Sequence, residues 1–186
     1  FMHQAEKRGI KVIIDLVVNH TSIDHRWYQE ARSSPDSFYR NWYHWSKKRP
    51  KNWRSGMVFP GVQESTWTYD RKAQAYYYHR FYEHQADLNM DNPAVRAEIN
   101  KIMGFWLQLG VAGFRVDAVP FIIEQTEPGV DQGALRFNYL ADMREFLQWR
   151  KGDAILLGEA TVLPDEMLPY FAEERPGLHL MFHFYV

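Results

Sequence analysis

Three short segments of the sequence combine apolar runs with charged or polar side chains near their ends. They are DLVVNH at residues 15–20, GFRVDAV at 113–119 and LLGEA at 156–160. A continuous apolar run is typical of a strand buried in a parallel sheet. A charged side chain in such a strand is unusual and calls for a structural or functional explanation. Carboxylates and imidazoles at the ends of such strands can act as nucleophiles and as general acids or bases.

Two of these segments supply a pair of carboxylates. Arg115 and Asp117 are two positions apart, so their side chains leave a strand on the same face. An arginine beside a carboxylate keeps it ionised, as a carboxylate nucleophile requires. Glu159 follows an apolar run, where partial burial would raise its pKa to suit a general acid. One ionised and one protonated carboxyl group are the minimum that retaining glycoside hydrolysis needs.

Each signal also has a simple structural explanation. An Arg–Asp pair at a strand end is often a salt bridge, and a lone Glu after an apolar strand is often a solvated end residue. The pair Asn19–His20 could likewise form a turn. Because the three segments occur in order on consecutive predicted strands, together they favour a catalytic site.

Residues 21–84 have a different character from the rest of the chain. They are rich in Trp and Tyr, lack clear periodicity and are too long for an ordinary connection. We therefore expect an insertion or small subdomain, with most of its aromatic side chains in its own core, although sugars also stack on aromatic faces. Within it, STWTYD and AYYYHRF predict a hairpin that turns at Arg71-Lys72.

The remaining segments alternate between helical and strand patterns. Asn92 and Pro93 predict a helix start, and Gly110 and Gly152 follow predicted helix ends. We expect helices at about 1–8, 93–109, 137–150 and 164–174, strands at about 11–18, 110–119, 154–160 and 178–184, and a loop at about 123–134. This order predicts βαβ units, an α/β fold and a parallel sheet. A doubly wound sheet would share the order, but no Gly-rich phosphate loop follows any predicted strand.

Composition excludes several classes of function. The net charge of -1 offers no field to hold nucleic acid, and no apolar run approaches the roughly 18 residues of a membrane span. The absence of Cys removes thiol chemistry and Cys-ligated zinc, and His79 and His84 lack partners at metal-ligand spacing. We expect a cytoplasmic protein with neither a nucleic-acid nor a membrane partner, and composition does not indicate its oligomeric state.

Four segments resemble the short signature regions of the alpha-amylase family of glycoside hydrolases. They are DLVVNH, QADLN at residues 85–89, GFRVDAV and LLGEA, in the family's order and at similar spacings. The resemblance implies a partial (β/α)8 TIM barrel that covers strands three to six. It also implies that residues 1–20 and 91–186 belong to the barrel and that 21–90 are a domain B insertion after the third strand.

The resemblance assigns expected roles to five residues. Asp117 matches the nucleophile that forms a covalent glucosyl-enzyme, and Glu159 matches the acid/base. Arg115 matches the residue that holds the nucleophile in place, and Asp15 matches the carboxylate that orients this arginine. His20 matches the imidazole that hydrogen-bonds the sugar.

Three further residues are candidates for binding. Asn19 and Asp87 match positions that often bind a structural calcium in this family, and both offer the oxygen donors that calcium prefers. Phe121 follows the strand that carries Asp117, and we expect it to form a wall of the pocket. The two carboxylates supply the chemistry themselves, so no cofactor is expected for it.

The segment YYYHRFYEHQADLNMDNPAVRAEI is similar to trehalose synthases, the subgroup that isomerises maltose to trehalose. Ala86 departs from the usual Pro of this subgroup, and residues 125–133 match no pattern. The implied ligands are alpha-linked glucosides such as maltose, trehalose or a malto-oligosaccharide. An alpha-glucosidase or alpha-amylase is the alternative, and a non-catalytic relative or a starch-binding module would belong to another class.

Both ends of the sequence lie within predicted helix or strand patterns, so we expect the chain to be part of a longer protein. The resemblance implies a transition-state-stabilising Asp after a seventh strand, which this sequence does not include. We therefore expect the isolated chain to be inactive. Conversion of maltose or trehalose by the isolated chain would contradict this expectation.

Overall fold

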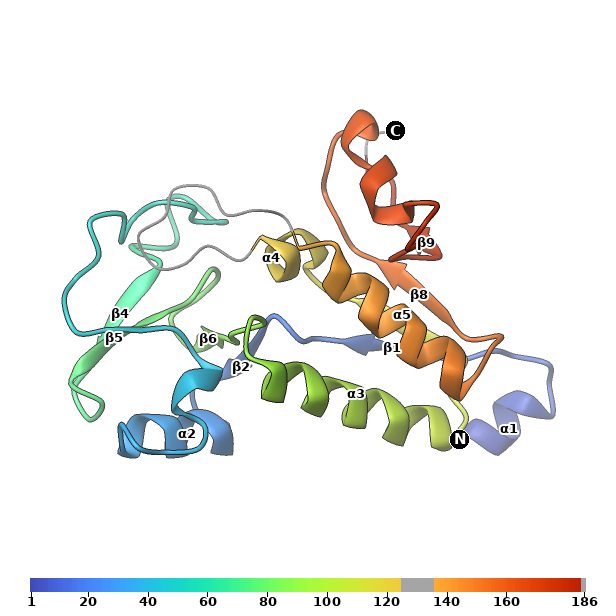
Figure 1. Cartoon of the computed structure of the whole chain (residues 1–186), viewed down its shortest axis with the longest axis horizontal. Helices are drawn as coiled ribbons and strands as arrows, with labels where there is room; N and C mark the ends of the chain where they lie inside the picture. Colours follow the sequence, from blue (N-terminus) through green and yellow to red (C-terminus); the bar gives the residue numbers. More distant parts are fainter. Residues whose placement is uncertain (125–135, 185–186) are drawn as a thin grey trace. The chain divides into compact units, whose positions relative to one another are not determined.

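The computed structural model describes residues 1–124 and 136–184, which form two compact units (Figure 1). Unit 1 contains the described residues of 1–18, 96–124 and 136–184, and unit 2 contains residues 19–95. Most of the predicted loop at 123–134 lies outside the described residues. The assignment of 21–90 as a domain B insertion stays a prediction.

Unit 1 is built on a four-stranded parallel sheet. Its strands are β1 (Ile13–Leu16), β7 (Gly113–Val116), β8 (Ile155–Gly158) and β9 (Leu180–Met181), in the order β1-β7-β8-β9. The apolar runs therefore pair in parallel in chain order, as the alternating pattern predicts. In register, Asp15 lies beside Arg115, which lies beside Leu157.

Helices precede or connect these strands. α1 (Met2–Glu6) precedes β1, α3 (Pro93–Gln108) leads into β7, and α4 (Val119–Ile123) and α5 (Asn138–Arg150) lie between β7 and β8. α3 and α5 are the two long helices in Figure 1. The helix start at Asn92 is confirmed, because its side-chain oxygen accepts a hydrogen bond from the Ala94 N–H at 2.9 Å. Within residues 1–124 and 136–184, no helix has the length and apolar character needed to cross a membrane.

Two expectations for unit 1 are wrong. Residues 164–174 form two short 3₁₀ helices, Pro164–Glu166 and Leu168–Phe171, instead of one α-helix. Pro169 explains the break, because its ring removes a backbone donor from the middle of the predicted helix. The first strand is also not buried on both faces. Ile13 in β1 is 38% exposed, and Val17, directly after β1, is 48% exposed.

Unit 2 contains two small antiparallel sheets. β2 (His20–Ser22) pairs with β6 (Gln85–Asp87), and β5 (Ala75–Tyr78) lies between β3 (Trp45–Ser46) and β4 (Trp67–Asp70). The predicted hairpin is therefore confirmed, with its turn between Asp70 and Ala75. The structure adds α2 (Arg26–Ser33) and a 3₁₀ helix, Arg40–Trp42, which the sequence analysis did not predict.

Aromatic side chains form much of the core of unit 2, as expected. Tyr28 is almost fully buried, and its ring meets the rings of Tyr43, Trp45 and Tyr77 at centroid distances of 5.3 to 5.6 Å. Ring pairs at this distance add specific contact energy to the burial of apolar surface. Most of these residues therefore serve the fold.

Candidate active site

The carboxyl ends of β1, β7 and β8 bring the predicted acidic residues of unit 1 together. Asp117 directly follows β7, and its N–H donates to the Leu16 carbonyl at 3.2 Å. Glu159 directly follows β8, and its N–H donates to the Val116 carbonyl at 2.9 Å. These bonds continue the parallel ladder beyond the strands, so Asp117 and Glu159 lie on neighbouring chains at the same edge of the sheet.

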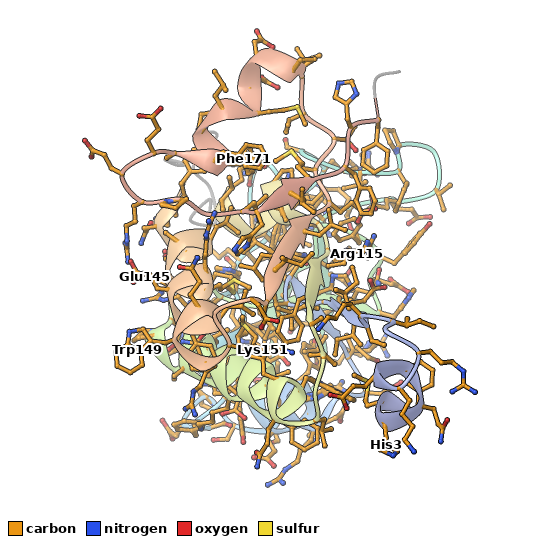
Figure 2. The ribbon with its side chains drawn as sticks, turned by 90° about the vertical axis from the view of Figure 1, so that its right-hand side faces the viewer. His3, Arg115, Glu145, Trp149, Lys151 and Phe171 are labelled. Atoms are coloured by element: carbon orange, nitrogen blue, oxygen red, sulfur yellow. The ribbon has the colours of Figure 1, made fainter. Side chains whose placement is uncertain are left out.

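Arg115 lies at the centre of this group and is labelled on the ribbon in Figure 2. Its Nη1 lies 3.2 Å from Asp15 Oδ1 and 3.1 Å from Asp117 Oδ1. Its Nη2 lies 2.6 Å from Glu159 Oε2. The side chain of Arg115 is only 24% exposed, so these charge-assisted contacts are partly shielded from water. One guanidinium therefore binds three carboxylates from three neighbouring strands.

The surroundings of the Asp117 carboxyl act on its pKa in two directions. Burial raises the pKa of the Asp117 carboxyl, and the neighbouring Glu159 raises it further, while Arg115 lowers it. The effect of Arg115 therefore has the predicted direction. Arg115 divides its contacts among three carboxylates, however, and its shortest contact is to Glu159. The ionised state of Asp117 stays a prediction.

The backbone turns sharply directly after Asp117. Ala118 has φ 53° and ψ 37°, a left-handed conformation that costs a non-glycine residue about 1–2 kcal/mol. α4 then begins at Val119, whose N–H donates to the Glu159 carbonyl at 3.1 Å. The turn and this bond fix the backbone on both sides of the carboxylate pair. Phe121 lies in α4 with its side chain partly exposed, and its contact with a substrate stays a prediction.

His20 belongs to unit 2. Its Nε2 lies 2.9 Å from the amide nitrogen of Gln85, and its ring centroid lies 5.4 Å from that of Phe81. Burial and the nearby His84 lower the pKa of His20, so the ring is neutral near pH 7. A neutral imidazole suits a hydrogen-bonding role toward a sugar.

Sequence reasoning missed the aromatic neighbours of His20. The Phe81 ring meets His20 on one side and lies 6.2 Å from the Phe59 ring. Phe81 lies four positions before QADLN, but a single aromatic residue in an aromatic-rich segment gave no separate signal. These rings therefore join His20 as candidate sugar contacts.

The calcium assignment of Asn19 and Asp87 stays a prediction, and the structure shows how the two side chains are bonded. Asp87 Oδ1 accepts a hydrogen bond from the Arg80 N–H at 3.0 Å, and the Asn19 side chain also hydrogen-bonds Asp87. Burial raises the pKa of Asp87 to about 7. Among the described residues, no group of three or more His, Cys, Asp or Glu side chains could hold a metal ion. The pair is a hydrogen-bonded contact in unit 2, and no step below uses calcium.

A parallel sheet with connecting helices and functional groups at the carboxyl ends of its strands is the architecture that (β/α)8 barrels share with doubly wound sheets, and the family decides between the two. The chain belongs to the alpha-amylase family, because the model of the alpha amylase catalytic domain matches residues 1–186. The family and the partial barrel predicted from the four segments are therefore confirmed. The described strands do not close into a barrel.

Known relatives agree with this family. The chain is 44% identical over 182 residues to a trehalose synthase of Thermus thermophilus, with 97% of the chain and 19% of that protein covered. It is 37% identical over 203 residues to an oligo-1,6-glucosidase of Bacillus cereus, with 98% and 35% covered. Its structure matches the crystal structure of Bacillus licheniformis trehalose-6-phosphate hydrolase with a TM-score of 0.84 at 35% identity, covering 99% of the chain and 35% of that structure. The chain thus spans about a third or less of the length of these relatives.

Proposed function

We propose that the protein containing this chain acts on alpha-glucosides with retention of configuration and isomerises maltose to trehalose. The observation that carries this proposal is the Arg115 group, in which Asp117 and Glu159 lie side by side at the carboxyl ends of neighbouring parallel strands. A carboxylate pair flanking the scissile bond is what retaining glycoside chemistry requires. The similarity to a trehalose synthase over nearly the whole chain supports the choice of reaction.

The first proposed step breaks the glycosidic bond. The ionised Asp117 carboxylate attacks C1 of the glucosyl unit, while Glu159 donates its proton to the leaving oxygen. A covalent glucosyl-Asp117 and a free glucose result. Retaining enzymes hold the two carboxyl groups about 5–5.5 Å apart, and here Glu159 is near enough to Asp117 to raise its pKa. In the proposed complex the glycosidic oxygen lies between the two carboxyl groups.

The second proposed step reverses the roles. The Glu159 carboxylate removes a proton from the C1 hydroxyl of the retained glucose, whose oxygen attacks C1 of the glucosyl-enzyme and releases Asp117 as a carboxylate. The product is trehalose, and Glu159 ends protonated as it began. His20 hydrogen-bonds the sugar, and Arg115 holds Asp117 in line. These steps need no cofactor.

Hydrolysis is the second candidate function. It uses the same residues but lets water attack the glucosyl-enzyme in place of glucose. The similarity to an oligo-1,6-glucosidase favours this alternative. A non-catalytic role would not need the Arg115 group.

The deciding experiment incubates the natural polypeptide that carries this chain with maltose and separates the products by chromatography. Trehalose with little glucose is the expected result. Glucose as the only product would show that the protein hydrolyses maltose and does not isomerise it. Asp117→Asn should lower turnover by at least about a thousandfold because it removes the nucleophile. Asp153→Asn is the matched control, since Asp153 is exposed and is not one of the carboxylates that contact Arg115. Equal activity of both variants would refute the proposed nucleophile.

A further inference from the structure

Unit 2 contains a cavity of about 650 Å³ whose described lining includes none of the predicted catalytic or sugar-contacting residues. Its walls include residues 62–65, 67–69 and 82–84 and also Arg49, Trp53, Tyr76 and His79. The volume falls within the roughly 300–1,000 Å³ of small-molecule sites. The cavity is therefore large enough to hold a sugar.

Aromatic faces and a guanidinium line one part of the cavity. The Arg49 guanidinium carbon lies 4.8 Å from the ring centre of Trp53 and 5.9 Å from that of Tyr76. The Tyr69 ring, which is 47% exposed, lies 5.0 Å from the Tyr76 ring. Stacked in this way, Arg49 presents its N–H donors in a fixed plane beside flat apolar surfaces. Flat apolar faces suit the C–H side of a sugar ring, and the donors suit its hydroxyl groups.

Buried residues hold the floor of the cavity in place. His79 is buried, with its Nε2 2.9 Å from Thr68 Oγ1 and its Nδ1 3.0 Å from the Phe81 carbonyl. The buried Ser65 donates from its hydroxyl to the Trp67 carbonyl at 3.1 Å. Because these polar groups are already paired within the protein, the floor is rigid before any ligand arrives.

The polar rim favours a neutral ligand with several hydroxyl groups. Glu64 and Glu83 both line the cavity and are exposed, and Arg49 opposes them with one positive charge. Burial lowers the pKa of His79, so this imidazole adds no charge at pH 7. Carboxylates accept hydrogen bonds from hydroxyl groups and would repel an anion such as a sugar phosphate.

We infer that this cavity binds an alpha-linked glucoside, of which maltose is the test ligand. The choice of glucoside rests on the proposed function, while the preference for a neutral sugar rests on the cavity itself. The protein then has a sugar site in unit 2 whose lining residues differ from those that carry the chemistry.

The test titrates maltose into the natural polypeptide by isothermal calorimetry, with Asp117→Asn present to block turnover. Two binding events are expected. Arg49→Gln and Glu64→Gln should each lower the affinity of one binding event by at least tenfold and leave the affinity of the other unchanged. Lys51→Gln is the matched control, because Lys51 is exposed and close in sequence but does not line the cavity. A thermal melt of each variant verifies folding. If Arg49→Gln is unstable, Glu64→Gln alone tests whether the cavity binds maltose.

The two possible failures are distinguishable. If His20→Ala abolishes all maltose binding and neither Arg49→Gln nor Glu64→Gln changes it, the cavity is not a sugar site and the proposed function stands. If Arg49→Gln and Glu64→Gln lose a maltose-binding event but the protein with Asp117 unchanged converts no alpha-glucoside, the proposed function fails. The sugar site in the cavity then remains.

Discussion

Arg115 faces more negative charge than one guanidinium can neutralise. Its three partners, Asp15, Asp117 and Glu159, would repel one another without it, since like charges a few ångströms apart are costly where water is partly excluded. The residue therefore stabilises the carboxyl ends of three strands and also positions the proposed nucleophile.

Replacing Arg115 separates these contributions. Arg115→Met should lower the free energy of unfolding at pH 7 by about 1–3 kcal/mol, because the carboxylates lose their counter-charge. The deficit should shrink toward pH 4 as carboxylates take up protons. Arg115→Lys should recover most of the stability but little of the turnover, because an ammonium lacks the planar fork that contacts three partners. Urea unfolding at both pH values and maltose turnover test this, and a deficit unchanged by pH would contradict it.

The sequence predicted the positions of the site residues better than their pKa values or their bonding partners. The spacing of Arg115 and Asp117 correctly places both side chains on one face, because strand geometry alone decides it. The raised pKa of Asp117 was not predictable, since it depends on burial and on the approach of Glu159 from the next strand. The partners of Asn19 and Asp87 likewise depend on pairing between distant segments.

At the scale of elements, Asp70 connects α2 to the turn of the β4–β5 hairpin. It accepts hydrogen bonds from the Tyr28 hydroxyl at 3.0 Å, from Arg32 Nη2 at 3.1 Å and from the Lys72 N–H at 2.8 Å. Burial alone would raise the pKa of Asp70, but bonds from the Ala73 N–H, Arg32 and Tyr28 outweigh burial and lower it. The ionised form is therefore favoured by the fold.

This depressed pKa predicts a pH dependence. A carboxylate with a lower pKa in the folded state adds stability above its unfolded pKa of about 3.9 and loses it as the pH falls through the folded value. Asp70→Asn should thus cost about 2 kcal/mol at pH 7 and progressively less below about pH 4. Urea unfolding across this range measures it. Asp36→Asn, at an exposed position of the same unit, is the control.

Gly113 controls the contact between β7 and β8. Its φ is 155°, and a Cβ atom there would overlap the backbone oxygen of Ile155 in the paired strand. Gly113→Ala should therefore lower the free energy of unfolding by at least about 2 kcal/mol, because backbone cannot move aside as a side chain can. Gly152→Ala is the control, since its nearest neighbour would be the Gln148 oxygen at 3.9 Å. Equal effects in thermal unfolding would contradict this account.

Helices and strands were predictable where a short stretch of sequence is enough to determine them. The apolar runs of β7 and β8 and the Asn92 cap of α3 are such signals. α2 was missed because it depends on tertiary contacts: the Tyr28 ring packs among core aromatics, and Arg32 binds Asp70 across 38 residues of sequence. The helix expected at 164–174 was wrong because Pro169 cannot donate a backbone hydrogen bond within a continuous α-helix.

At the scale of the whole molecule, the described residues form two units, each with its own core. Phe114 and Leu156 are fully buried in unit 1, and Tyr28 and Tyr77 are buried in unit 2. Units with separate cores can unfold independently of each other.

Hydrogen exchange should detect this independence. Gly113→Ala should accelerate amide exchange in β1, β7 and β8 and leave the β4–β5 hairpin protected, because the hairpin bonds stay within unit 2. Asp70→Asn should show the opposite pattern. Mass spectrometry of peptic peptides from both variants makes the comparison, and uniform acceleration throughout would mean that the units unfold as one.

The exposed edge of β1 has a practical consequence for handling the chain. Ile13 in β1 and Val17 directly after it present apolar side chains, and one side of the strand pairs with no described residue. Unpaired backbone groups flanked by apolar side chains form a template on which another copy can add a strand. Preparations of the isolated 186 residues should therefore self-associate as concentration rises, and Val17→Lys should keep them dispersed in light scattering.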